Sequence, residues 1–365
     1  MEIPNLTSLE AHKQRAPGKN RIILGLMTFG PDVEAGARIT SLDTFKQCLD
    51  HLQARGYNEV DTAESYIGTK QQAFTRSAGW KERGLKLATK YYPTKKAGHS
   101  AAILRDRLEF NLRELGTDCV DIFYLHAADR TRSFHEPLEA VDKMHREGKF
   151  IELGLSNFTA FEVAEVVTLC AERGWIKPTI YQGMYNAITR NLETETMIAC
   201  RRYGIDVVVY NPLAGGLFSG KIKSKDLVPD DGRFSDTSTA IGKNYRSRYF
   251  RDGTFEALKI IEDVAKEENL TMLEIGLRWC VHHSALHLAN KGGNDGIIIG
   301  VSSFEQLKQN LDNLEKGPLP KSVVEALDKA WLVSKPNSPN YWHGELKYTY
   351  DTQALFSKKL RGVLS

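Results

Sequence analysis

Eight short, continuously apolar runs alternate with amphipathic stretches along this chain, and that alternation restricts its possible folds more than any other feature. Runs of this kind, rich in Ile, Val and Tyr, are typical of parallel strands that are buried on both faces. They lie at 21–27, 58–61, 85–90, 120–126, 151–156, 179–185, 206–210 and 296–301.

Apolar residues recur at helical spacing between these runs, as Leu104, Leu108 and Leu112 do. The helical stretches lie at about 44–55, 70–79, 101–116, 137–147, 159–173, 194–203, 254–268 and 304–315, with two further helices at 271–284 and 322–335. A glycine suited to a left-handed C-cap follows five of them, at Gly56, Gly116, Gly148, Gly174 and Gly204. The order predicts an α/β fold, a (β/α)8 TIM barrel with two extra helices, that occupies 21–335 as one domain.

Three segments fall outside this rhythm. Residues 1–20 form a charged N-terminal arm. Residues 211–253 form a long loop after the seventh strand, for which a functional lid is favoured over a disordered insertion. Residues 336–365 form a C-terminal tail. It contains more aromatic residues than a solvent-exposed tail usually has, so we expect it to pack on its own barrel or on a partner subunit.

Composition excludes several classes of function. The formal net charge is +3 and no dense Lys/Arg block occurs, which argues against nucleic-acid or membrane-surface binding. Neither a secretory signal nor an apolar run of about 18 residues is present. The five cysteines are scattered and read as buried thiols of a reducing compartment, so a cytoplasmic protein is expected. No metal site is predicted.

Four polar residues stand at or just beyond strand ends, where a parallel barrel gathers side chains at its mouth: Asp61, Tyr66, Lys90 and His126. Together they can protonate a carbonyl oxygen. Tyr66 is the candidate proton donor, and we expect Lys90, held by Asp61, to lower the pKa of its phenol. His126 can donate a second hydrogen bond that orients the substrate.

Several motifs resemble the aldo-keto reductase family from residue 21 to about 342. These are VDTAESY at 60–66, ATK at 88–90, FYLH at 123–126 and GLSNF at 154–158. YQGMYN at 181–186, YNPLAGGL at 210–217, RW at 278–279 and HHS at 282–284 are similar to the branch that contains aflatoxin aldehyde reductase and succinic semialdehyde reductase. The resemblance implies NADPH-dependent reduction of aldehydes, with ketones or dicarbonyls as further substrates.

No GxGxxG motif follows a strand here, so the sequence does not indicate a Rossmann-type cofactor site. The cofactor contacts are those that the resemblance implies. Ser156, Asn157 and Gln182 would bind the nicotinamide carboxamide, and Tyr210 would stack on the ring. The pyrophosphate would be held by Asn211, Leu213, Gly215 and Lys221, with Arg233 closing over it. The adenosine end would lie at Ser302, Gln306, Gln309 and Asn310. Tyr245 and Arg248 would join His126 around the substrate, and Arg248 would favour a carboxylated aldehyde.

The chain also departs from the family pattern. Gly300 and Gln306 stand where many members place cations for the 2′-phosphate, and the chain continues past Asn340-Tyr341, where close members end with a substrate-binding Arg. Two other functions stay open. One is a redox-sensing binding subunit resembling the β-subunits of potassium channels, and the other is an alcohol or aryl-alcohol dehydrogenase that runs toward oxidation. The expected partners are a small aldehyde and, as a candidate homodimer, a second copy of the chain.

Overall fold

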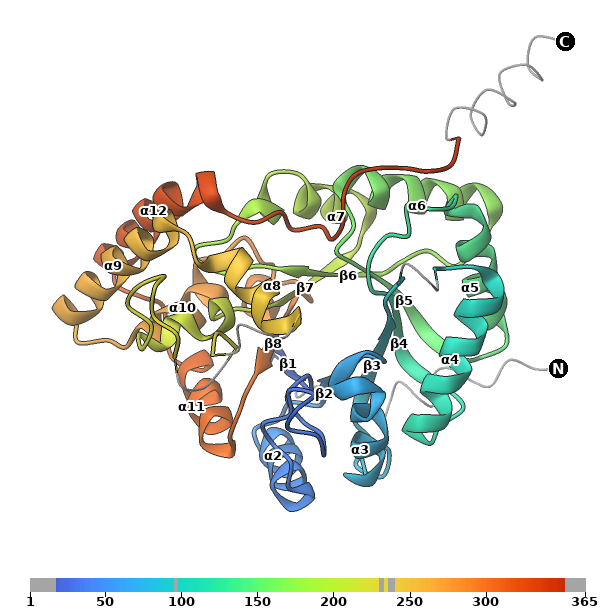
Figure 1. The fold of residues 1–365 in the computed structure, drawn as a ribbon, viewed down its shortest axis with the longest axis horizontal. Coiled ribbons are helices and arrows are strands. Elements are labelled where there is room, and N and C mark those ends of the chain that lie inside the picture. Colours follow the sequence, from blue (N-terminus) through green and yellow to red (C-terminus); the bar gives the residue numbers. More distant parts are fainter. Residues whose placement is uncertain (1–17, 95–97, 230–232, 236–239, 352–365) are drawn as a thin grey trace, which may run out of the picture.

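Eight parallel strands close into a barrel, in which each strand pairs with its neighbour in sequence and β8 returns to β1 (Figure 1). The computed structural model describes residues 18–94, 98–229, 233–235 and 240–351. The strands are β1 (Arg21–Gly25), β2 (Glu59–Asp61), β3 (Lys86–Tyr91), β4 (Val120–Leu125), β5 (Phe150–Ser156), β6 (Ile180–Met184), β7 (Asp206–Tyr210) and β8 (Gly296–Gly300). The predicted (β/α)8 barrel is confirmed.

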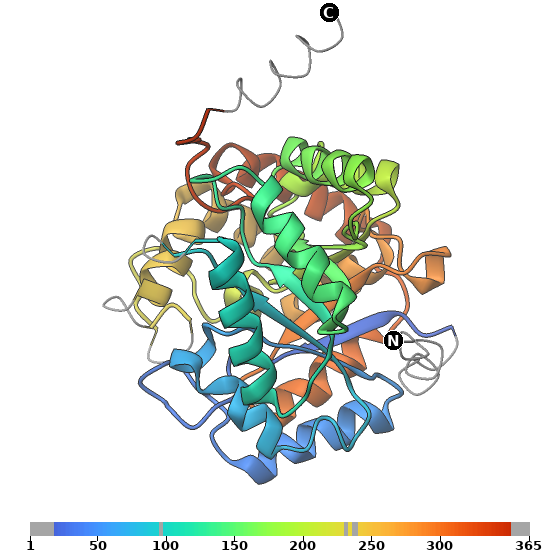
Figure 2. The same cartoon turned by 90° about the vertical axis from the view of Figure 1, so that its right-hand side faces the viewer.

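Helices surround the barrel on all sides in the two ribbon views (Figure 2). The ten predicted ones are α2 (Leu42–Ala54), α3 (Gln71–Ser77), α4 (Ala101–Leu115), α5 (His135–Arg146), α6 (Ala160–Arg173), α7 (Thr196–Tyr203), α9 (Asp252–Glu267), α10 (Met272–His282), α11 (Phe304–Leu314) and α12 (Lys321–Ser334). The five predicted C-cap glycines all have positive φ, between 66° at Gly174 and 79° at Gly56. A side chain would be strained there.

Alternate strand residues fill the barrel interior in three layers. At the bottom, Arg21 pairs with Glu59 at 2.8 Å and Lys86 pairs with Glu152 at 2.8 Å. The middle layer is apolar and consists of Ile23, Ala88, Ile122, Tyr124, Ile180, Val208 and Ile298. Continuing the same alternation brings Asp61, Lys90 and Gln182 to the upper, carboxyl-end layer. The side chains that point into the barrel therefore form a polar layer at the carboxyl ends of the strands, the mouth of the barrel, above an apolar middle layer.

Gly154 makes room for this apolar middle layer. A Cβ atom at Gly154 would lie 2.3 Å from the Tyr124 ring. Only glycine allows the β5 backbone to pass so close to the aromatic side chain that fills the barrel.

The connection after β7 is not a continuous loop, and the prediction was incomplete here. It contains a short 3-10 turn, η3 (Ala214–Ser219), and a helix, α8 (Ala240–Tyr249). The α8 sequence carries no apolar stripe that would reveal it. Two aromatic residues, Tyr245 and Tyr249, instead pack against Phe234. Tertiary contacts between aromatic rings thus support a helix that has little amphipathic signal of its own.

The tail runs from the end of α12 past α7 toward α6 (Figure 1). We call residues 341–349 the strap. Tyr341 is buried, accepts a hydrogen bond from the Ala160 backbone at 3.3 Å and donates one to Glu195. Up to residue 351, then, the tail packs on its own barrel. Residues 352–365, and all of the expected N-terminal arm except 18–20, lie outside the described residues.

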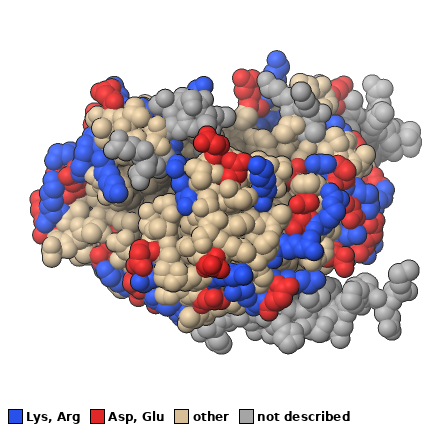
Figure 3. All heavy atoms as spheres, turned by 60° about the horizontal axis from the view of Figure 1, so that its bottom comes forward, with Lys and Arg blue, Asp and Glu red and all other residues tan. Residues whose placement is uncertain are grey.

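Both signs of charge are interspersed over most of the face drawn in Figure 3. Among the described residues, no helix is both long enough and apolar enough to cross a membrane. In the same part of the chain, no group of His, Cys, Asp and Glu side chains is arranged to hold a metal ion.

Candidate active site

A buried ion pair lies at the centre of the mouth. Lys90 Nζ is 2.5 Å from Asp61 Oδ2 and donates to the Thr62 carbonyl at 2.7 Å. The other oxygen of Asp61 accepts from Gln182 Nε2 at 2.9 Å. Burial lowers the pKa of Lys90, and the neighbouring Asp61 opposes that shift. Two of the four predicted residues are therefore locked together, with Gln182 fixed beside them.

Tyr66 begins a distorted turn, η1 (Tyr66–Thr69), just after β2. Ile67 has φ 49° and ψ 48°, a left-handed conformation that is costly for a β-branched residue. Ile67 is buried, and a Cβ at Gly30 would come within 2.9 Å of its side chain. Packing against Gly30 thus holds the strained residue that follows the candidate proton donor.

The pKa expected for Tyr66 was wrong in direction. Burial and the Asp61 carboxylate raise the pKa of Tyr66 well above its ordinary value. Lys90 Nζ does lie 5.2 Å from the centre of the Tyr66 ring. Its charge, however, is matched by Asp61 at half that distance, so the phenol experiences the pair and not an isolated cation. Tyr66 is therefore held as a neutral phenol.

His126 follows β4 and faces Tyr66, with ring centres 6.4 Å apart and the planes 76° from parallel. Burial and the nearby Lys90 lower the pKa of His126 well below its ordinary value, so the imidazole is neutral. Its Nδ1 atom is buried and has no hydrogen-bond partner. All four predicted catalytic residues therefore lie together at the mouth.

The candidate nicotinamide ligands form a connected network at the ends of β5, β6 and β7. Asn157 donates to the His126 carbonyl at 2.8 Å and to Ser156 Oγ at 3.0 Å. It accepts from the Tyr210 hydroxyl at 2.8 Å. Both N–H groups of the Asn157 amide are thus used within the protein, whereas its oxygen accepts from one donor and has a second lone pair for a bound carboxamide.

The candidate pyrophosphate residues lie on the segment after β7. Asn211, at φ 66°, donates to the Tyr249 hydroxyl at 2.6 Å and accepts from the Gly215 backbone at 2.6 Å. A Cβ at Gly215 would be 2.7 Å from the Tyr245 ring. Leu213 packs partly buried on the core, and Lys221 is exposed. Asn211 and Gly215 therefore also join the β7 loop to α8.

Arg233 lies close to the mouth. Its guanidinium carbon is 5.6 Å from the centre of the Tyr245 ring, and its charge acts to lower the pKa of Tyr66. Arg233 therefore lies near Tyr66, the candidate proton donor.

The candidate adenosine residues surround the start of α11. The backbone N–H and the hydroxyl of Ser302 both donate to Gln306 Oε1, at 2.8 and 2.9 Å. Gln309 is exposed, and Asn310 is buried with an Oδ1 atom that has no partner. An unpaired buried acceptor at this position fits a ligand that brings its own N–H group.

Around the candidate substrate position, Arg248 stacks 5.6 Å from the centre of the Tyr245 ring. Its Nη2 atom lies 3.1 Å from His343 Nε2, in the strap. Tyr92 lies between the two histidine rings, 5.5 Å from His126 and 5.9 Å from His343. Sequence analysis missed Tyr92 and His343. The inward alternation after Lys90 could have indicated Tyr92, but no local pattern indicates His343.

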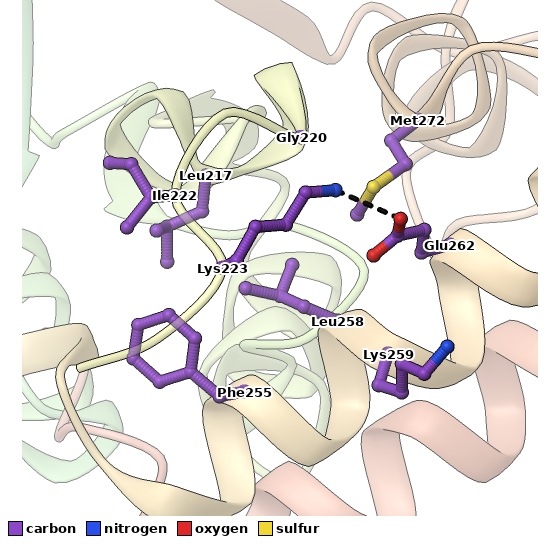
Figure 4. A pocket seen from close by; sticks show the side chains of 9 residues that line it. All are labelled: Leu217, Gly220, Ile222, Lys223, Phe255, Leu258, Lys259, Glu262 and Met272. Atoms are coloured by element: carbon purple, nitrogen blue, oxygen red, sulfur yellow. Dashed lines mark ion pairs between the residues drawn. The ribbon is translucent and has the colours of Figure 1, made fainter. Parts of the chain in front are cut away.

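Two cavities lie elsewhere. One, of about 170 Å³, lies between η3, α9 and α10, and its wall includes the Lys223–Glu262 ion pair at 2.9 Å (Figure 4). The other, of about 530 Å³, is an open hollow beside α3 and includes Phe74 and Phe110. Neither contains a residue of the predicted site, which is formed by converging strand ends.

A closed parallel barrel with a phenol, an imidazole and a buried ammonium–carboxylate pair at its mouth places the molecule among the barrel oxidoreductases. The chain belongs to the aldo/keto reductase family, whose model matches residues 21–332. Enzymes of this family typically use NADH or NADPH and act on small carbonyl compounds.

Relatives cover most of the chain. It is 40% identical to aflatoxin B1 aldehyde reductase member 2 of Rattus norvegicus over 337 residues, which are 90% of this chain and 89% of that protein. It is 41% identical to an aldo-keto reductase of Pseudocercospora fijiensis over 298 residues, 80% of this chain and 99% of that protein. Aldo-keto reductase family 7 member A3 of Homo sapiens is 38% identical over 340 residues, 90% and 99% of the two chains.

Proposed function

We propose that the protein reduces aldehydes to alcohols with NADPH, and that Tyr66 supplies the proton. The observation that carries this proposal is the convergence of Tyr66, His126 and the buried Lys90–Asp61 pair at one mouth. Family membership supports it, as does the similarity to proteins named aflatoxin B1 aldehyde reductases.

The residues divide the acid–base work. When bound, NADPH would supply the hydride. Tyr66, neutral because its pKa is raised, donates a hydrogen bond to the carbonyl oxygen and then its proton, since an alkoxide is a stronger base than a phenolate. The Lys90–Asp61 pair, whose ammonium lies 5.2 Å from the ring centre, fixes the polar surroundings of the phenol, and solvent returns the proton to the phenolate.

His126 would orient the substrate. A buried N–H without a partner costs more than a buried lone pair, so the unpaired Nδ1 favours the tautomer with its proton on Nε2. That N–H is then free to donate a second hydrogen bond to the carbonyl oxygen.

The residues present fit a dinucleotide. The orphaned Oδ1 of Asn310, within α11, suits an adenine N–H, and Ser302 and Gln306 lie at the start of the same helix. Ser156, Asn157 and Gln182 offer amide and hydroxyl groups for the carboxamide, with Tyr210 for the ring. Asn211, Leu213, Gly215, Lys221, Arg233 and Gln309 would complete the contacts along the cofactor.

The substrate class we propose is aldehydes that carry a carboxylate. Arg248 is partly buried, and no carboxylate pairs with it among the described residues. A cation placed at the mouth without a counter-ion favours an anionic group on the substrate. Tyr245, against which Arg248 stacks, would line the same position.

The test is Tyr66→Phe. We expect turnover of succinic semialdehyde to fall by about 10²–10⁴-fold while NADPH still binds, because a donor lost from the transition state leaves the cofactor contacts in place. Steady-state assays and fluorescence titration with NADPH measure the two effects. Retention of more than about a tenth of the activity would overturn the assignment. Absence of turnover in the wild-type protein, with NADPH bound, would favour the redox-sensing subunit.

A further inference from the structure

The strap brings one side chain into the mouth. His343 is held by its backbone on both sides: its N–H donates to the Asn157 carbonyl at 3.2 Å, and its carbonyl accepts from Arg130 Nη1 at 2.5 Å. Its imidazole Nε2 lies 3.1 Å from Arg248 Nη2. This is the only side-chain hydrogen bond of Arg248 within the described residues. The orientation of the Arg248 guanidinium therefore depends on a residue 95 positions away in sequence.

The chemistry of this contact fixes the state of the histidine. A guanidinium has only donors, so His343 Nε2 must accept and the ring must carry its proton on Nδ1. Burial and the charges of Arg248 and Arg130 lower the pKa of His343 to about 3. The Tyr92 ring packs beside the imidazole as a neutral group. His343 is therefore a neutral acceptor across the working pH range.

The anchorage of the strap makes this acceptor rigid. Arg130 is itself buried and paired with Glu162 through two contacts, at 2.6 and 3.0 Å. Farther along the strap, Tyr348 donates to Glu162 at 2.6 Å and the Thr349 backbone donates to the Arg130 carbonyl at 3.1 Å. Contacts of Tyr341 on one side and Tyr348 on the other thus fix His343, which is ordered without a bound ligand.

We propose that His343 is a positioning residue for substrate selection, which holds the Arg248 guanidinium in place to receive the carboxylate of an aldehyde substrate. This inference rests on the proposed function. An arginine with free rotamers would lose conformational entropy when it binds a carboxylate, and the His343 contact removes part of that loss in advance. The effect belongs to binding of carboxylated substrates, because a neutral aldehyde does not use the guanidinium.

The first experiment compares His343→Ala with His343→Gln. We expect His343→Ala to raise KM for succinic semialdehyde about tenfold, the change that corresponds to ordering one long side chain. The kcat, and the KM for 4-nitrobenzaldehyde, should stay within about twofold. In His343→Gln, the amide oxygen replaces the acceptor and should restore most of the KM. Equal losses for both aldehydes, or no rescue by Gln, would overturn the proposal.

A second experiment tests whether His343 acts through Arg248. In an Arg248→Met background, His343→Ala should change KM for succinic semialdehyde no further. Additive losses would show an independent role and contradict the inference. His145→Ala is the matched control, since the His145 ring contacts Phe150, with Nδ1 3.1 Å from its carbonyl oxygen, at the opposite end of β5. It should leave both KM values unchanged.

A readout independent of turnover separates the two proposals. Histidine-selective ¹⁵N NMR of the wild type, assigned by comparison with His343→Gln, should show one ring protonated on Nδ1 and bare on Nε2 down to about pH 4. If the wild type reduces neither aldehyde but shows this tautomer, the proposed function fails while the contact stands. A His343 signal that titrates near its ordinary pKa would overturn the contact.

Discussion

Lys90 and Asp61 show how one pair of residues can serve both stability and chemistry. Both side chains are almost fully buried, at 0% and 5% exposure, and their charges compensate one another at 2.5 Å. Removing one partner of such a pair leaves an uncompensated charge in a low-dielectric interior, which costs more than the pair itself contributes. The pair therefore stabilises the carboxyl end of the barrel, and its Asp61 carboxylate contributes to the raised pKa of Tyr66.

We predict that Lys90→Met and Asp61→Asn each lower the free energy of unfolding by about 3–5 kcal/mol. The double variant should lose clearly less than the sum, because neither charge then remains unpaired. Urea denaturation of the four proteins measures this coupling. Lys143→Met, in a pair whose side chains are 62% and 43% exposed, is the control and should cost less than about 1 kcal/mol. Additive losses in the double variant would exclude a coupled pair.

At the scale of elements, two segments outside the strand–helix repeat complete the mouth. α8 contributes Tyr245 and Arg248, and the strap contributes His343. Both are secured by side chains of the barrel itself: Asn211 bonds α8 through Tyr249, and the Arg130–Glu162 pair bonds the strap. α8 and the strap, which carry the proposed substrate-binding residues, are thus additions to a barrel that already carries Tyr66, Lys90 and His126.

Glu162 provides a test of strap anchorage. It pairs with Arg130, accepts from Tyr348 and forms the capping box of α6 with Thr159. We predict that Glu162→Gln lowers the free energy of unfolding by about 3 kcal/mol, as expected for a broken buried pair. It should also make residues 341–349 sensitive to limited proteolysis. Glu325→Gln, whose partner Lys321 is exposed, should change neither quantity, and an unaltered strap in Glu162→Gln would contradict the anchorage.

The loop that carries Arg233 gives a prediction about cofactor choice. We expect NADPH to bind more tightly than NADH by about 1–3 kcal/mol, as for a charge-assisted contact, and salt to narrow the gap. Because Arg233 and the 302–310 segment are the groups expected to hold the adenosine phosphate, Arg233→Met should weaken the binding of NADPH more than that of NADH. Fluorescence titrations measure the four dissociation constants, of two proteins for two cofactors, at low salt and again at high salt. Equal affinities of the wild type for the two cofactors would refute the preference, and an equal loss for both cofactors in Arg233→Met would assign Arg233 to the shared pyrophosphate.

For the molecule as a whole, the barrel was predictable because its strands are buried on both faces and read as apolar runs, so their bounds differ from prediction by at most two residues. The positions of Asp61 and Lys90 at strand ends also indicated that their side chains lie at the mouth of the barrel. α8 was missed because Lys243, Asn244 and Arg246 hide its helical pattern. The His343–Arg248 contact and the pKa of Tyr66 depend on groups brought together only by the closed fold.

Three histidines whose pKa values are lowered by burial should make the free energy of unfolding depend on pH. Burial lowers the pKa of His99 to about 4, and the pKa values of His126 and His343 are also lowered. The unfolded chain binds protons at these positions below about pH 6.5 and the native chain does not, so stability falls as pH decreases from 6.5 toward 4. For His99 alone the loss between pH 6.5 and 5 is roughly 2 kcal/mol.

Urea titrations at pH 7, 6 and 5 measure this slope. The slope reports how many protons the chain takes up when it unfolds. In His99→Asn this number should fall by about one, whatever the free energy of unfolding of the variant is at pH 7. A slope that the substitution leaves unchanged would show that His99 is protonated in the native state.

Under the role proposed for His343, the place of the strap after all eight strands in the sequence also determines when, during synthesis, substrate selectivity arises. A nascent chain that has reached residue 335 already contains all eight strands together with Tyr66, Lys90 and His126. Chains fold from the N-terminal side as they emerge from the ribosome, so the barrel can close before residues 341–349 arrive. A product that stopped between these points would keep the groups that transfer protons but would lack His343. The proposal therefore predicts that such a protein discriminates poorly between acidic and neutral aldehydes, because His343, which contacts Arg248, is translated after every strand of the barrel.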